Sequence, residues 1–140
     1  MPDEISARCN AIEQCYEFML AYAGQGLNGD EGGQSSGQVR EYLNRAAEAL
    51  SGLAEAYATA VKQENRQPAE PYHAFLAVLD SDARGSLAAI QLVLAQPALS
   101  SQLIDNLNAS IHLRALLTDL FLVDEILKPQ RVQAKPVTTG

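Results

Sequence analysis

The chain has 140 residues, of which 47% are hydrophobic and 19% charged, a composition that is typical of one folded domain and excludes a disordered chain. No apolar run approaches the roughly 18 residues that a membrane span needs. The net charge of −7 repels nucleic acid and anionic lipid, so we expect neither nucleic acid nor a membrane as a partner.

The first predicted element is a helix over residues 5–23, because apolar residues recur there at helical spacing on two neighbouring faces. The first set is Ile5, Cys9, Ile12, Tyr16, Met19, Leu20 and Ala23, and the second is Ala11, Cys15, Phe18 and Tyr22. The helix is therefore apolar over more than one stripe.

The two cysteines, Cys9 and Cys15, lie six residues apart on this helix. At about 100° per residue they point in different directions, so they cannot bridge each other within the helix. The amino-terminal residues show no basic stretch followed by an apolar core, the pattern of a secretory signal. We therefore expect a cytoplasmic protein whose thiols are reduced.

Residues 24–37 contain six of the nine glycines, together with Ser, Gln, Asn and Asp. Glycine has the greatest backbone freedom, so this stretch is predicted to be a flexible loop. Ser35 and Gln38 have the spacing of a capping box for the next helix.

The second predicted helix covers residues 39–62, and its apolar residues alternate steps of four and three. They are Val39, Leu43, Ala46, Leu50, Leu53, Tyr57 and Ala60. The third predicted helix begins at Pro68 or Pro71 and extends to Leu94, with an apolar stripe from Tyr72 onward. Segment 80–85, with its Asp, Ser and Gly residues, is a candidate for a kink or break in this helix, near Asp80–Gly85.

The fourth predicted helix covers about Ala98–Leu127, between Pro97 and Pro129, and Pro129 is expected to end it. It has two apolar stripes, one of Leu99, Leu103, Leu107, Leu117 and Phe121, and another of Leu113, Leu116, Leu120, Val123 and Leu127. Residues 129–140 have no periodicity and are predicted to form a disordered basic tail.

No segment alternates with the period of a strand, and short links connect the last three helices. The sequence therefore predicts an all-α protein in which residues 1–128 form a single domain. The expected architecture is an up-down four-helix bundle, because short links force antiparallel neighbours.

The glycine-rich loop contains Gly24-x-Gly26-x-x-Gly29, the spacing of a dinucleotide-binding fingerprint. Such a site needs a strand before it and a helix opening at its end. Here a predicted helix precedes it, and Asp30 and Glu31 would repel a phosphate. We expect no nucleotide at this loop.

Metal and catalytic motifs are incomplete. Glu70-x-x-His73 matches half of a di-iron bundle motif, which needs a second copy and two further core glutamates. His112 lies in a row with Asp105 and Asp119, which is predicted to be a solvated polar face and not a phosphoacceptor site. We expect no metal, no cofactor and no catalytic constellation.

Arg114 projects near the first apolar stripe of the fourth predicted helix. Its stem can cover apolar surface while the guanidinium reaches water. Alternatively, it is a partly buried cation that pairs with Asp124 or faces a ligand. With His73 or the tyrosines, Arg114 would then mark a small-ligand or catalytic site between helices.

The first and fourth helices carry more apolar surface than one packed face requires. The preferred hypothesis is therefore a non-enzymatic interaction protein, such as an adaptor, regulator or assembly factor. We expect it to form a homodimer and to bind a protein partner through an exposed apolar face. The candidate interface residues are Cys15, Phe18, Tyr22, Leu116, Val123 and Leu127.

Overall fold

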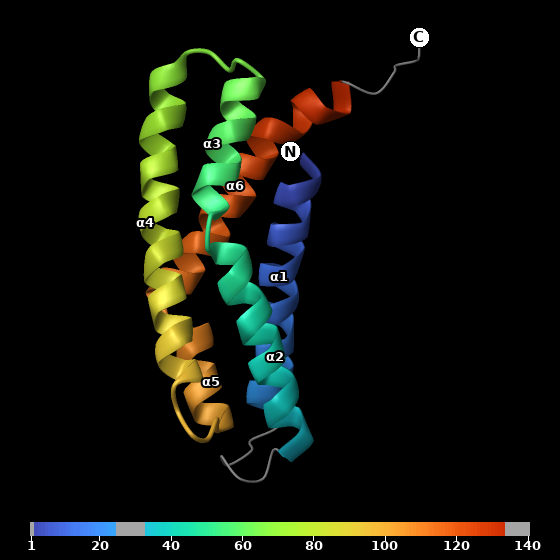
Figure 1. The fold of residues 1–140 in the computed structure, drawn as a ribbon, viewed down its shortest axis with the longest axis vertical. Helices are drawn as coiled ribbons and strands as arrows, with labels where there is room; N and C mark the ends of the chain where they lie inside the picture. Colours follow the sequence, from blue (N-terminus) through green and yellow to red (C-terminus); the bar gives the residue numbers. More distant parts are fainter. Residues whose placement is uncertain (1, 25–32, 134–140) are drawn as a thin grey trace.

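The computed structural model describes residues 2–24 and 33–133, and within these ranges every regular element is a helix (Figure 1). The helices are α1 Pro2–Gly24, α2 Gly33–Leu50, α3 Leu53–Gln63, α4 Ala69–Leu94, α5 Ser101–Asn108 and α6 Ile111–Gln133. The prediction of an all-α protein is confirmed, but two of the four predicted helices are each divided in two.

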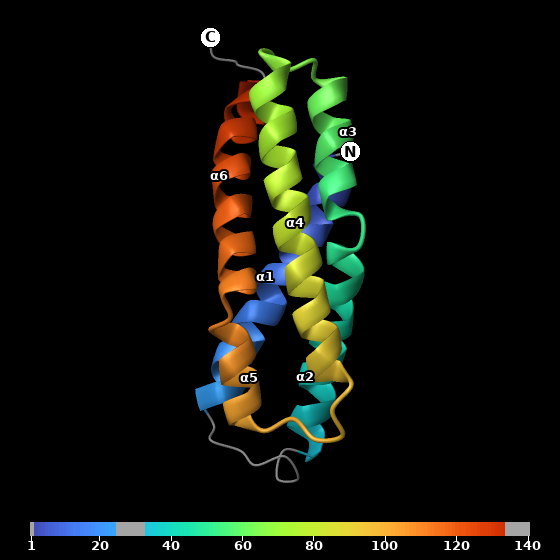
Figure 2. The ribbon, with the colours of Figure 1, turned by 90° about the vertical axis from the view of Figure 1, so that its left-hand side faces the viewer.

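The helices lie lengthwise in an elongated molecule (Figures 1 and 2). The chain descends in α1, rises through α2 and α3, descends in α4, and rises again through α5 and α6. Among the described residues, α1 packs on α2, α3 and α5, whereas α4 packs on α2, α3, α5 and α6. The pair α1 and α6 is not among the closely packed pairs of the described residues.

The predicted helix over 39–62 is interrupted at Gly52, whose φ of 90° lies in the left-handed region. Glycine adopts this conformation without the steric cost that a Cβ brings. The Arg8 guanidinium of α1 donates hydrogen bonds to the freed carbonyl oxygens of Ala49 (2.8 Å) and Ser51 (2.7 Å). The prediction of one continuous helix was wrong, because the apolar spacing continues across a break that glycine and Arg8 stabilise.

The predicted helix over 98–127 is likewise divided, between α5 and α6 at Ala109 and Ser110. Ser100 Oγ accepts a hydrogen bond from the Leu103 N–H and caps α5. Ser110 Oγ accepts one from the Leu113 N–H at the start of α6. Each serine accepts from an N–H that has no partner within its own helix. The two caps stabilise two separate helices, α5 and α6, where one helix was predicted.

The end of α6 and the start of α2 also differ from the prediction. Helix α6 passes Pro129 and ends at Gln133, so the prediction that Pro129 ends the helix was wrong. Helix α2 begins at Gly33, so the last five residues of the predicted loop are helical and Ser35 is not its cap. The nucleotide fingerprint falls mainly on residues 25–32, which lie outside the described residues, as do 134–140 of the predicted tail.

Helix α4 is unbroken through the segment predicted to kink or break near Asp80–Gly85. Gly85 lies against α6, since a Cβ added there would come within 2.9 Å of His112 Nδ1. The neighbouring Ser86 Oγ donates a 2.9 Å hydrogen bond to the His112 carbonyl. The small residues therefore permit close packing of α4 on α6 and do not end the helix.

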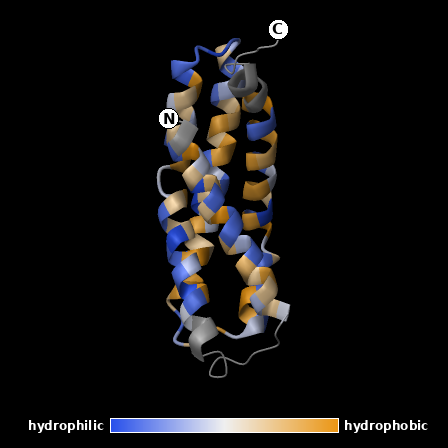
Figure 3. Cartoon of the chain, turned by 90° about the vertical axis from the view of Figure 1, so that its right-hand side faces the viewer, coloured by the Kyte–Doolittle hydropathy of each residue, from blue (hydrophilic) through white to orange (hydrophobic). Residues whose placement is uncertain are grey.

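The core is contributed by all six helices of the described chain, and its largest buried side chains include Tyr22, Tyr57, Met19 and Leu116. The Tyr22 hydroxyl donates a hydrogen bond to the Leu99 carbonyl and so joins the end of α1 to the segment before α5. Hydrophobic residues also extend along much of α6 (Figure 3), and several of them reach the surface.

Candidate functional site

The six residues predicted to form an interface do not lie on an exposed face. Cys15, Tyr22, Leu116, Val123 and Leu127 are all buried within the single chain. Phe18 is half-buried and stacks on Tyr42, with 4.5 Å between the ring centroids. The prediction that these residues form an exposed patch was wrong.

For the residues of α6, the error comes from the break between α5 and α6. A stripe that joins Leu99, Leu103 and Leu107 to Leu117 and Phe121 assumes one helical phase, and the break at Ala109 and Ser110 interrupts that phase. Phe121 was placed in the core stripe, but it is 61% exposed. The exposed apolar residues in this part of α6 are instead Phe121, Leu122 and Ile126.

A first surface, here called the α4–α6 groove, is a hollow of about 340 Å³ between α3, α4 and α6. Its lining is almost wholly apolar and consists of Val61, Pro71, Tyr72, Phe75, Leu76, Leu122, Val123 and Ile126. Leu122 and Ile126 stand at its edge with 51% and 44% of their surface exposed. Apolar side chains gathered in this way are typical of a protein interface.

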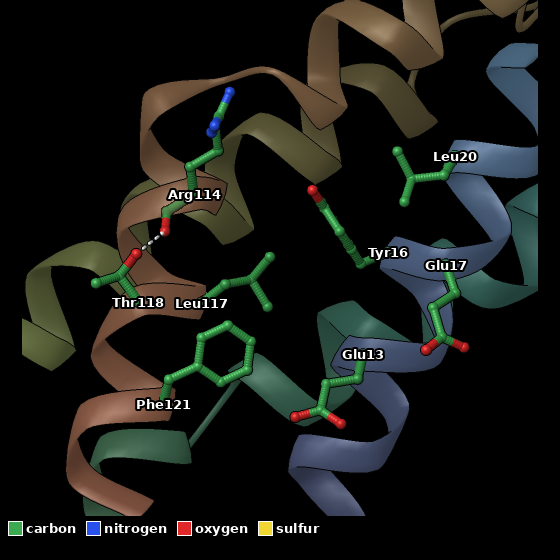
Figure 4. Close-up of a pocket in the computed structure, with 8 residues that line it drawn as sticks. All are labelled: Glu13, Tyr16, Glu17, Leu20, Arg114, Leu117, Thr118 and Phe121. Atoms are coloured by element: carbon green, nitrogen blue, oxygen red, sulfur yellow. Dashed lines mark hydrogen bonds between the residues drawn. The ribbon is translucent and has the colours of Figure 1, made fainter. Parts of the chain in front are cut away.

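A second surface, here called the α1–α6 pocket, is a hollow of about 610 Å³ between α1 and α6 (Figure 4). Its lining mixes apolar and charged groups and consists of Glu13, Tyr16, Glu17, Leu20, Arg114, Leu117, Thr118 and Phe121. In Figure 4, Leu117 and Phe121 point from α6 toward α1, and Leu20 points toward the opening from α1. Arg114 lies at the Leu20 end, and Glu13 lies at the Phe121 end.

The Glu13 end of this pocket is negatively charged. Partial burial raises the pKa of Glu13, and the charges of Asp124 and Glu17 raise it further. Asp124 Oδ1 accepts a 2.8 Å hydrogen bond from the Tyr57 hydroxyl, which also lies 3.2 Å from Cys9 Sγ. Two neighbouring carboxylates, Asp124 and Glu17, thus act on Glu13 at one end of the pocket.

Arg114 is exposed, so it is not the partly buried cation of the alternative interpretation, and it lines the α1–α6 pocket. Its proposed pairing with Asp124 is not seen, because Asp124 takes the Tyr57 hydroxyl, and Arg114 makes no ion pair within the described part of the chain. His73 is exposed near the start of α4 and lines a different hollow, beside Lys62 and Arg66. The structure therefore does not bring Arg114 and His73 into one site.

The prediction that Asp119 faces solvent was wrong. Asp119 was expected in a solvated row with Asp105 and His112, but it is buried while both of them are exposed. Burial, together with the hydrogen bond and the negative charge of Asp82 on α4, raises the pKa of Asp119 to about 7. Its helical row gave no signal of this contact, which depends on the close approach of α4 and α6.

Both cysteines are free and buried. Burial raises the pKa of the Cys15 thiol to about 12, so this sulfur stays protonated at neutral pH. A protonated, buried thiol is a poor nucleophile.

Among the described helices, none is long and apolar enough to cross a membrane. Comparison with protein-family models, with curated proteins and with solved structures finds no match for this chain. The α4–α6 groove and the α1–α6 pocket are therefore the features from which a function is inferred.

Proposed function

We propose that the protein is a non-enzymatic interaction protein, such as an adaptor, regulator or assembly factor, that forms a homodimer through the α4–α6 groove. The observation that carries the proposal is the exposure of Leu122 and Ile126 beside a groove with an almost entirely apolar lining. Counted with α2–α3 and α5–α6 as two interrupted rods, the chain forms an up-down four-helix bundle, and this apolar surface lies on its outside.

A second copy suits this face because the ridge and the groove lie next to each other. In a two-fold interface the same patch occurs on both subunits, so the Leu122 and Ile126 ridge of one copy enters the groove of the other. Each fully buried leucine or isoleucine side chain contributes about 1.5–3 kcal/mol, and the symmetry uses each contact twice.

The experiment is light scattering on the purified chain at micromolar concentration. The unmodified protein should have the mass of a dimer, and the Leu122→Glu, Ile126→Glu variant the mass of a monomer with unchanged circular dichroism. The matched control is Leu92→Glu, Ile111→Glu, which places the same charge at two exposed apolar positions outside the groove. A monomeric wild type, or a double variant that remains dimeric, would contradict the proposal.

A second candidate function is small-ligand binding in the α1–α6 pocket, and Arg114 is the observation that favours it. The pocket volume of about 610 Å³ lies within the range of ligand sites. An exposed guanidinium without an ion pair in the described chain could hold an anionic group. The pocket is an open hollow between two helices rather than an enclosed cavity, which favours recognition of a larger partner.

A further inference from the structure

An open hollow lies between α1 and α6. Each helix packs on other neighbours, but the two are not a closely packed pair among the described residues. The Tyr57 hydroxyl of α3 contacts both helices, at 2.8 Å from Asp124 Oδ1 of α6 and 3.2 Å from Cys9 Sγ of α1. Two helices that flank an open, partly apolar hollow are a geometry in which amphipathic helices are recognised.

The two edges of this opening are apolar. Leu20 on α1 is 49% exposed and Phe121 on α6 is 61% exposed, and both line the pocket (Figure 4). Between them, Leu117 is buried at the base of the pocket. A helix laid along the opening would cover Leu20 and Phe121 with the apolar side chains that it presents at i, i+3, i+4 and i+7.

The charges of the pocket are distributed unevenly along its length. Glu13 and Glu17 line the pocket, and the negative charges of Glu17 and Asp124 act on Glu13 toward one end. Arg114 stands at the other end. A bound helix has a positive amino-terminal end and a negative carboxy-terminal end, so this arrangement favours one orientation.

We infer that the α1–α6 pocket binds an amphipathic helix of a partner protein whose apolar stripe is bordered by lysine or arginine. The bound helix runs parallel to α1, with its amino-terminal end at Glu13 and its carboxy-terminal end at Arg114. The site is separate from the α4–α6 groove and does not depend on the proposed homodimer.

The test uses a designed helical peptide of about 14 residues, or four turns, with a leucine stripe bordered by lysines. Its counterpart carries glutamate at every lysine position. Fluorescence anisotropy at about 0.15 M salt should show saturable binding of the lysine peptide to the full chain and none of the glutamate peptide, since charges away from the contact are screened there.

Two pairs of variants locate the peptide. Glu13→Lys, Glu17→Lys should weaken binding about tenfold or more, whereas Glu48→Lys, Glu55→Lys makes the same charge change at exposed positions on α2 and α3 and should change it little. Leu20→Ala, Phe121→Ala should also weaken binding about tenfold, and Leu92→Ala should not.

Each remaining outcome decides the proposal. No saturable binding of the lysine peptide, equal binding of both peptides, or equal loss in both charge variants overturns it. A lysine peptide with two central prolines should not bind, and equal binding of that peptide would mean that the pocket takes a cationic group and not a helix. Binding should persist in Leu122→Glu, Ile126→Glu, so its loss there would place the peptide on the α4–α6 groove instead.

Discussion

The Tyr57 hydroxyl donates a 2.8 Å hydrogen bond to Asp124 Oδ1 and thereby joins α3 to α6. Burial is the largest cause of a raised Tyr57 pKa, and the contacts with Cys9 and Asp124 add to it. The hydroxyl therefore keeps its proton and remains a donor. The same contact fixes the carboxyl group of Asp124 near Glu13.

Replacing Tyr57 by phenylalanine should remove this donor while keeping the ring in the core. Because a hydrogen bond to a charged group contributes about 1.5–3 kcal/mol, the free energy of unfolding should fall by about that amount. Urea denaturation followed by circular dichroism measures it. Tyr72→Phe, at a half-buried position, is the matched control and should cost less. An unchanged midpoint for Tyr57→Phe would show that the bond does not stabilise the fold.

Asp119 should make stability depend on pH. Its pKa is raised from the ordinary 3.8 to about 7, first by burial and then by Asp82, so the folded chain binds more protons than the unfolded chain between these values. Stability from this group is therefore greatest at low pH and falls as the pH rises toward about 7.

The Asp119→Asn variant removes that titration. Urea titrations at pH 5 and pH 8 should show the variant to be more stable than the wild type at pH 8, by about 1–2 kcal/mol, with a smaller difference at pH 5. Asp105→Asn, at an exposed position, is the control and should show no such change. A wild type whose stability rises from pH 5 to pH 8 relative to Asp119→Asn would reverse the assigned direction.

Two glycines should respond to alanine in opposite directions. Gly52 has a φ of 90°, so Gly52→Ala should destabilise the fold by about 1 kcal/mol or more. Gly37 lies inside α2 with open space around its Cβ position, so Gly37→Ala should stabilise the fold by about 0.5–1 kcal/mol. Thermal melting of the two variants compares them directly, and shifts of the same sign would contradict the break between α2 and α3.

The helical phase of α6 can be tested with two truncations. Leu116 is fully buried, so Leu116→Ala should lower the free energy of unfolding by about 2–5 kcal/mol. Phe121→Ala should lower it by less than about 0.5 kcal/mol, because this ring is mostly exposed. Chemical denaturation of both variants gives the values. A larger loss of unfolding free energy for Phe121→Ala than for Leu116→Ala would instead support the apolar stripes predicted for one unbroken fourth helix.

Apolar spacing predicted the all-α fold class and the extent of α1 and α4 well, since each of these helices is continuous from end to end. It did not reveal the breaks, because Leu50 and Leu53 keep their spacing across Gly52, and the stabilising contact comes from Arg8, more than forty residues earlier. Two local signals mark the breaks, since Gly52 can adopt a left-handed conformation and Ser110 can cap a helix.

The α4–α6 groove and the α1–α6 pocket depend on how the helices are placed relative to one another. The periodicity of apolar residues along the sequence does not predict that placement. The sequence predicts that the second stripe of α6 faces outward, whereas α6 packs that stripe on the core and leaves Leu122 exposed. Arg114 was recognised as a candidate ligand-facing residue from its place beside an apolar stripe. Glu13 and Glu17 were missed, since only the opening between α1 and α6 places them opposite Arg114 in one pocket.

The most direct test of the proposed homodimer is an isotope-filtered nuclear Overhauser measurement on an equal mixture of labelled and unlabelled chains. It detects only contacts between different copies. The account predicts contacts from the methyl groups of Leu122 and Ile126 in one copy to the rings of Tyr72 and Phe75 in the other. An absence of such contacts in a sample that tumbles as a monomer would contradict it.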